Sequence, residues 1–151
     1  MKNLGSVTME KEEAQEKVDK GWIKVRAFIE VMAIKEEAAT MALEKHVEKI
    51  GKQDGIEIYK KEFDEPEVVE NPPTKKANKA YSQIAEIEFV VSSVKNLMTF
   101  SMLYGPSSVE VMEPDSLKIK GGELQDMANS ISALMHQYAS QGAGGIVASP
   151  D

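Results

Sequence analysis

The chain has 151 residues, of which 42% are hydrophobic and 28% are charged, and its formal net charge is −7 at pH 7. This length suffices for one domain with a sizeable core, and the acidic balance disfavours a nucleic-acid surface, which needs clustered positive charge. The absence of cysteine excludes disulfides, thiolate nucleophiles and thiolate metal sites.

No apolar run approaches the roughly 20 residues of a membrane-spanning helix, and residues 1–13 lack the apolar core of a signal peptide. We therefore expect a cytoplasmic protein with no membrane partner. Arg26 is the only arginine among 18 basic residues. Lysine and glutamate enrichment without cysteine is compatible with a thermophile source. A lone arginine also disfavours phosphate or carboxylate sites built from several guanidinium forks.

The first predicted element is a charged helix over residues 9–20, which Gly21 ends. Glu13 and Lys17 form an i,i+4 pair in the favourable order, as do Glu16 and Lys20. Few of its residues are apolar, so we expect it to dock weakly or to pack on a partner.

Strict alternation from Trp22 to Ile34 predicts a long first strand. The odd positions from Ile23 to Ala33 are apolar and predict a buried face. The opposite face carries too many apolar groups for a solvated surface, namely Trp22, Phe28, Met32 and Ile34. We expect a second subunit or the terminal helix to cover that face.

The remaining elements are predicted from two spacings of apolar residues, the helical period of about 3.6 residues and the strand period of two. We predict helices over residues 35–50, 94–104 and 124–138, and strands over residues 56–63, 82–92 and from 109 onward. Residues 64–80 are expected to form a long hairpin tip or a flexible loop, and the flanking strands can extend to Val69 and from Ala80. On the second strand, Tyr59 and Phe63 are predicted to face away from Ile56 and Ile58.

The resulting order, β-α-β-β-α-β-α, predicts an α+β fold, a ferredoxin-like βαββαβ sandwich with an N-terminal helical segment and an additional C-terminal helix. The predicted boundaries are residues 1–21 for the helical segment and 22–139 for the ferredoxin-like domain. Residues 140–151, rich in glycine, alanine and serine, are predicted to be a disordered tail.

From Leu97 the chain reads Leu-x5-Leu-Tyr-Gly-Pro, then Val109-Glu110-Val111-Met112-Glu113-Pro114, Leu117 and a helix ending at Tyr138. Over residues 97–138 this pattern resembles the WCX domain, the C-terminal extension of WYL-type transcriptional regulators. The resemblance implies a ferredoxin-like fold linked to oligomerisation and effector sensing. No helix-turn-helix and no WYL core are visible in the chain.

Four residues are candidates for binding a ligand. Arg26 and Glu30 share the wetter face of the first strand, where they could contact a ligand, but we favour a role as cross-strand ion-pair partners. His46 lies within an apolar helical stripe, either in a pocket or bonded to a backbone carbonyl, and we favour the carbonyl because no second metal ligand lies three or four residues away. Tyr59 lies on the second strand.

The sequence contains no catalytic or metal motif, so we predict no catalytic residue, no metal site and no cofactor. We expect a non-catalytic domain that forms a homo-oligomer and senses a small-molecule ligand, with nucleic acid disfavoured as a partner. Two alternatives stay open: a small lyase or isomerase of the dimeric α+β barrel kind, and a structural or interaction subunit.

Overall fold

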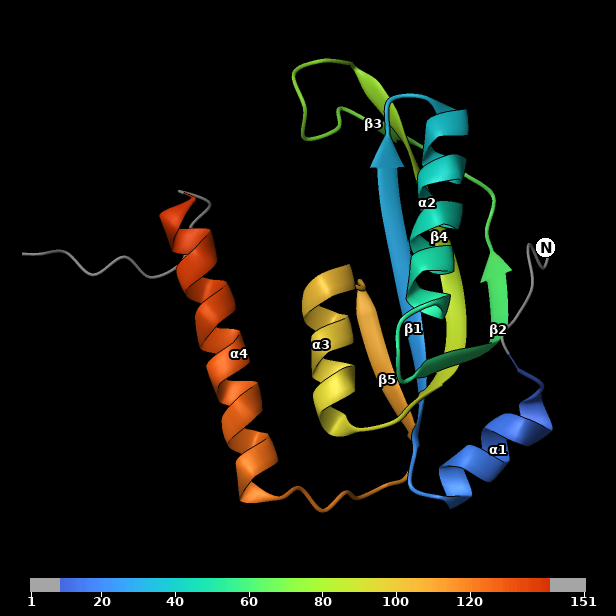
Figure 1. Cartoon of the computed structure of the whole chain (residues 1–151). Helices are drawn as coiled ribbons and strands as arrows, with labels where there is room; N and C mark the ends of the chain where they lie inside the picture. The colour runs from blue at the N-terminus through green and yellow to red at the C-terminus, as the bar shows by residue number, and fades with distance from the viewer. Residues whose placement is uncertain (1–8, 142–151) are drawn as a thin grey trace, which may run out of the picture. The chain divides into compact units, whose positions relative to one another are not determined.

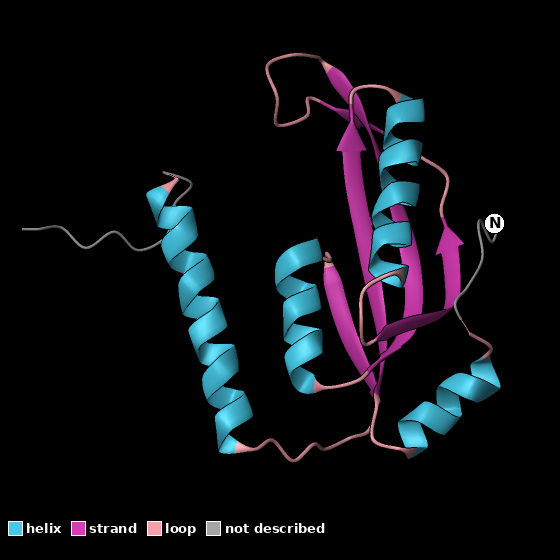
Figure 2. Ribbon diagram, in the orientation of Figure 1, coloured by secondary structure: helices cyan, strands magenta, loops and turns pink. Residues whose placement is uncertain are grey.

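The computed structural model describes residues 9–141 (Figure 1). These residues form four helices and a five-stranded sheet (Figure 2). The elements are α1 (Lys11–Asp19), β1 (Ile23–Ala33), α2 (Glu36–Gly51), β2 (Ile56–Phe63), β3 (Glu67–Glu70), β4 (Lys79–Val91), α3 (Val94–Tyr104), β5 (Ser108–Glu113) and α4 (Gly121–Ser140). The chain divides into two compact units, which meet between Ser116 and Leu117, and only α4 belongs to the second.

The sheet has the strand order β2-β4-β1-β5, with the short β3 also paired to β4, and every pair is antiparallel. Of the two central strands, β1 pairs with β4 along its whole length, from Ile23 opposite Val91 to Ala33 opposite Tyr81. The predicted α+β class is confirmed. The predicted extension of the hairpin strands is also confirmed, because β3 pairs with the start of β4.

The main core lies between the sheet and two helices, α2 and α3. Alternate residues of the strands, including Val25, Ile87 and Phe89, are buried with Leu43 of α2 and Phe100 of α3. The predicted helix boundaries have local causes. The side chain of Ser93 accepts a hydrogen bond from the Asn96 N–H at the start of α3, and Gly105 takes the left-handed conformation (φ 52°) that ends it.

The opposite face of the sheet is partly covered by α1. Ala14 is completely buried there, and it packs in a small cluster with Met9, Tyr59 and Val90. Of the two expectations for this helix, docking on the chain's own sheet is the one that agrees with the structure. Part of the face that was expected to need a second subunit or the terminal helix is covered by the chain's own α1.

A β-bulge in β2 corrects one predicted side-chain direction. The pairing of β2 with β4 shifts between Ile58 and Lys60, so that Tyr59 has no residue opposite it. The extra residue returns Phe63 to the helix-covered face, where it is buried with Ile58, and leaves Tyr59 on the other. A pattern of strict alternation places Phe63 on the wrong face for this reason.

The second unit contains α4, which confirms the predicted helix over residues 124–138. Its apolar stripe was expected to be buried, and the described residues of its own unit leave several of its large side chains exposed: Leu124, Ile131, Met135 and Tyr138. The predicted tail over residues 140–151 lies, from residue 142 onward, outside the described residues. Within residues 9–141, no helix combines the length and apolarity that crossing a membrane requires.

Candidate ligand-binding site

A cavity of about 450 Å³ opens on the face of the sheet away from α2 and α3. Its walls come from α1 and from four strands of the sheet, β1, β2, β4 and β5. They consist of Lys11, Lys24, Arg26, Tyr59, Lys60, Glu88 and Met112. Four of these seven residues are cations and one is an acid, which contrasts with the net charge of −7 of the whole chain.

Two β-bulges, one on each outer strand, aim side chains into this cavity. Tyr59 is the unpaired residue of β2, and Met112 is the unpaired residue between Val111 and Glu113 of β5. Because of the first bulge, Tyr59 and Lys60, although consecutive, both lie on the cavity side. A regular strand would send one of them to the opposite face, so the bulge is what builds this wall.

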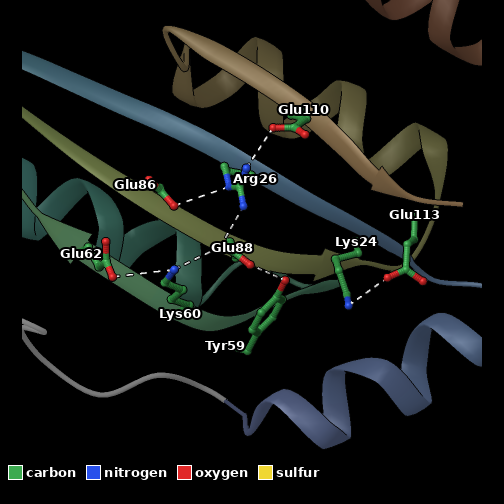
Figure 3. A network of polar contacts seen from close by, with 9 residues as sticks. All are labelled: Lys24, Arg26, Tyr59, Lys60, Glu62, Glu86, Glu88, Glu110 and Glu113. Atoms are coloured by element: carbon green, nitrogen blue, oxygen red, sulfur yellow. Dashed lines mark hydrogen bonds and ion pairs between the residues drawn. The ribbon is translucent and has the colours of Figure 1, made fainter. Parts of the chain in front are cut away.

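Glu88 lies at the centre of the site and is only 6% exposed. Its Oε1 accepts a hydrogen bond of 2.8 Å from the Tyr59 hydroxyl, and its Oε2 faces Lys60 Nζ at 3.4 Å and Arg26 Nη2 at 3.5 Å (Figure 3). We call Glu88 and these three donors the Glu88 cluster. Both carboxylate oxygens are occupied, which is how a buried charge is tolerated.

Arg26 bridges three strands through its guanidinium. Besides Glu88, it faces Glu86 on β4 at 3.5 Å and Glu110 on β5 at 3.2 Å (Figure 3). Its Nε is buried and has no hydrogen-bond partner. The hypothesis of cross-strand ion pairs for Arg26 therefore agrees with the structure, and the buried Nε has only the carboxylate of Glu86 beside it.

Lys24 closes the side of the cavity next to α1. Its Nζ donates to Gln15 Oε1 at 2.7 Å and to Glu113 Oε2 at 3.1 Å. Although it is a lysine, its exposed fraction is only 7%, because α1 lies over it. A lysine held so firmly presents its charge at a fixed position.

The electrostatics hold the Glu88 cluster in one protonation state near neutral pH. Burial opposes ionisation of Glu88, but hydrogen bonds from Tyr59 and Lys60 and the charge of Arg26 outweigh it and lower the pKa of Glu88. Burial, with the adjacent Glu88 carboxylate, raises the pKa of the Tyr59 hydroxyl. Burial works against the charge of Arg26 and Lys60 too, yet the carboxylates around them raise the pKa of each.

The structure brings together two of the four predicted ligand-binding residues, Arg26 and Tyr59. Glu30 lies further along β1, outside the cavity, where its Oε2 accepts a hydrogen bond of 2.6 Å from Ser82. His46 lies on the helix side of the sheet. Its Nε2 bonds to the carbonyl oxygen of Tyr104 at 3.0 Å, and its ring contacts the Tyr104 ring edge-on.

Sequence reasoning missed Glu88, the residue that organises the site. Its signal was present but faint: Glu86 and Glu88 occupy alternate positions of a strand whose other face is apolar. An acid in such a strand is usually solvated, so its burial becomes visible only when β1 and β2 bring Arg26 and Lys60 alongside it.

Within residues 9–141, no group of three or more histidine, aspartate and glutamate side chains is placed to hold a metal ion. The donors that line the cavity are mostly cationic, which disfavours a metal cation further.

The model of the MJ0538 family matches residues 24–150. The chain belongs to the MJ0538 family. The matched range contains every residue that lines the cavity except Lys11. No significant match is found among curated proteins or among solved structures. Membership of the MJ0538 family names no substrate or partner, so the function must be argued from the cavity itself.

In this MJ0538-family site, the side chains keep constant charge states around neutral pH. Tyr59 stays protonated, Glu88 stays ionised, and Arg26 and Lys60 stay cationic through the neutral range. General acid–base catalysis needs a group whose pKa lies near the working pH, and none of these four meets that condition.

Proposed function

We propose that the chain is a non-catalytic, homo-oligomeric domain of ferredoxin-like fold that senses a small molecule in the cytoplasm. The strand order β2-β4-β1-β5 supports this fold, because without the short β3 it places the first strand between the third and the fourth. The resemblance of residues 97–138 to WCX domains favours the same combination of oligomerisation and sensing.

The observation that carries the ligand-binding part is the cavity beside the Glu88 cluster. At about 450 Å³ it falls within the range of small-molecule sites, and its polar groups converge from three elements, α1, β1 and β2, around a buried carboxylate. A cavity with fixed charges recognises a ligand without changing it. This is the behaviour expected of a sensor.

The oligomeric part is supported by apolar side chains of α4 that the described residues of its own unit leave exposed. On α4, Leu124 is 57% exposed, Ile131 40% and Tyr138 45%, at spacings of seven residues along one helical stripe. Such a stripe is stable in water only when it is covered. A second copy of the chain offers the same stripe and can cover it symmetrically.

Oligomerisation is tested by light scattering coupled to size-exclusion chromatography. For the wild type we expect a mass of two or more times the 16.6 kDa of one chain, and for Ile131→Glu we expect the mass of a monomer. Asn129→Glu places the same charge on the opposite side of α4 and should leave the mass unchanged. A monomeric wild type at micromolar concentration would refute the oligomer.

Ligand binding is tested by a thermal-shift screen of small molecules of every charge class against the wild type. At least one class should raise the melting temperature, because a ligand that binds only the folded state stabilises it. The alternative of a small lyase or isomerase is favoured only by the presence of Arg26 and Tyr59 in one cavity. Chemical turnover of a stabilising compound would establish that alternative in place of a sensor.

A further inference from the structure

We propose that α4 pairs with α4 of a second copy of the chain, that the two helices run in opposite directions, and that Ala128 faces the partner's Ile131. This inference rests on the proposed function, because it takes the homo-oligomer as its starting point. It adds that the oligomer is a dimer, and it adds the direction and the register of the helix contact. All the residues that carry it belong to α4 (Gly121–Ser140).

Five exposed side chains form a continuous line along α4, which we call the α4 seam. They are alternately four and three residues apart, as in the contact line of two packed helices: Leu124, Ala128, Ile131, Met135 and Tyr138. Two further apolar residues lie to one side of the seam, and of these Met127 is buried and Leu134 is half-buried. The exposed apolar line is therefore narrow, and a narrow line of this kind is typical of contact with one other helix.

The charged residues of α4 lie away from the α4 seam. The two acids, Glu123 and Asp126, and the histidine, His136, occupy other sides of the helix. Two copies of a chain with a net charge of −7 repel each other, so they associate most easily through a surface without charge. The α4 seam is such a surface, whereas a basic partner would find no carboxylate on it. The charge distribution therefore favours a second copy as the occupant.

The sizes of the seam residues favour an antiparallel pair. In a parallel pair each seam residue packs against its own copy, so Ala128 meets the partner's Ala128 and leaves a void, while Tyr138 meets the partner's Tyr138. In an antiparallel pair, small residues can face large ones. Ala128 then faces the partner's Ile131. Leu124 faces the partner's Met135, and two-fold symmetry repeats both contacts. The layers of the antiparallel pair have similar volumes, which allows close packing without voids.

The proposed register also uses the whole length of the α4 seam. It places Tyr138, the largest side chain of the seam, beside the partner's Gly121, which has no side chain. A shift by one heptad in either direction carries Leu124 or Tyr138 past an end of the partner's α4. These two side chains are 57% and 45% exposed, so either shift would leave a large apolar group in water. The proposed register therefore covers more apolar surface than its neighbours do.

The chain contains no cysteine, so single-cysteine variants of the whole chain test the contact directly. Leu124→Cys and Met135→Cys are treated with a short bis-maleimide cross-linker, each alone and as an equimolar mixture. Mass spectrometry then gives the composition of each cross-linked dimer. In the proposed pair, the two different cysteines of the mixture face each other. Two identical cysteines stand about 16 Å apart along the helix axis, because 11 residues of helix separate the positions they occupy.

We expect the mixture to give about tenfold more cross-linked dimer than either variant alone, with one chain of each variant in the product, because facing cysteines react at a high effective concentration. Ala133→Cys is the matched control. Ala133 is exposed on the side of α4 opposite the seam, so its cysteine should give no cross-linked dimer in either orientation. Light scattering on each variant before cross-linking checks that the mass is still twice the 16.6 kDa of one chain.

A parallel pair would give the reverse pattern, in which each variant cross-links alone and the mixture yields no mixed dimer. That pattern would overturn the inference and leave the proposed homo-oligomer standing. A wild type that is dimeric by light scattering, but whose variants cross-link neither alone nor in the mixture, would do the same. If the purified wild type is a monomer, the inference and the homo-oligomer fail together, and something other than a second copy must cover the α4 seam.

Discussion

Tyr59 donates a hydrogen bond of 2.8 Å to Glu88 at the one position of β2 that has no pairing partner on β4. The side-chain bond thus joins the two strands where their backbone register shifts. It also satisfies one oxygen of a carboxylate that is only 6% exposed. The bulge and the buried acid depend on each other, because the bulge aims the hydroxyl and the acid anchors it.

Tyr59→Phe keeps the ring and removes only this hydroxyl. We expect the free energy of unfolding at pH 7 to fall by about 1–3 kcal/mol, because a buried carboxylate oxygen loses its partner. Urea denaturation measures the loss. Tyr81→Phe, on β4 outside the Glu88 cluster, should change the free energy by less than about 0.5 kcal/mol. Equal effects from the two variants would show that the Tyr59 hydroxyl contributes nothing specific.

The acid stability of the protein depends in part on Glu88, whose pKa is lowered in the folded state. Burial alone would raise it, but hydrogen bonds from Tyr59 and Lys60 and the charge of Arg26 outweigh burial. A carboxyl group with a lowered folded pKa stabilises the fold above its unfolded pKa of about 4.3, and that stability is lost as the pH falls through the folded pKa.

Glu88→Gln should therefore be less stable than the wild type at pH 7, and the difference should shrink as the pH falls below about 4.5. Urea denaturation at intervals from pH 7 to pH 3 follows this difference. Glu37→Gln, an exposed carboxyl on α2, is the control, and its difference from the wild type should stay small throughout. A deficit of Glu88→Gln that is independent of pH would contradict the role assigned to its charge.

The elements of the sheet and its helices could be predicted from the sequence because burial on one face repeats at a fixed period. The alternation from Ile23 to Ala33 is confirmed as β1, and the helix predicted over residues 94–104 is confirmed as α3, which Ser93 caps and Gly105 ends. These features depend on neighbours within a few residues. Local sequence carries such information directly.

The pocket could be predicted only in part, because its features depend on distant residues. The bulge adds one residue at Tyr59 but hardly disturbs the alternation of apolar and polar residues in the sequence. The predicted side-chain direction of Phe63 was wrong for this reason. The burial of Glu88 depends on cations from β1 and β2. The docking of α1 depends on few apolar side chains, of which Ala14 is the smallest and the most deeply buried.

Lys61 is the neighbour of Lys60 but faces the helix side of the sheet, and it is only 9% exposed. Burial lowers the pKa of its ammonium, and the charge of Glu48 offsets this only in part. A lysine whose folded pKa is lowered destabilises the fold while it is charged. The protein therefore gains stability as the pH rises through the folded pKa toward the unfolded value of about 10.4.

Lys61→Met should raise the free energy of unfolding at pH 7 by about 1 kcal/mol. It should also remove the part of the increase in stability at alkaline pH that comes from deprotonation of Lys61. Lys60→Met is the matched control, because its ammonium pairs with Glu88 and its loss should lower the stability instead. Urea denaturation at pH 7 and pH 10 measures both. If Lys61→Met were destabilising at both values, the ammonium would be better accommodated than its burial implies.

Gly55 precedes β2 in a left-handed conformation, with φ at 80°, and lies against the start of α3. A Cβ atom at this position would stand 2.5 Å from Asn96 Nδ2 and 2.6 Å from Ser92 Oγ, two atoms that are hydrogen-bonded to each other. Gly55→Ala should therefore cost about 2 kcal/mol or more in free energy of unfolding, from backbone strain and from the broken Ser92–Asn96 bond. Gly121→Ala, where a Cβ meets only open space, should be neutral or slightly stabilising. Thermal and urea denaturation of the two variants decide the matter, and a Gly55→Ala protein as stable as Gly121→Ala would mean that this turn readjusts without cost.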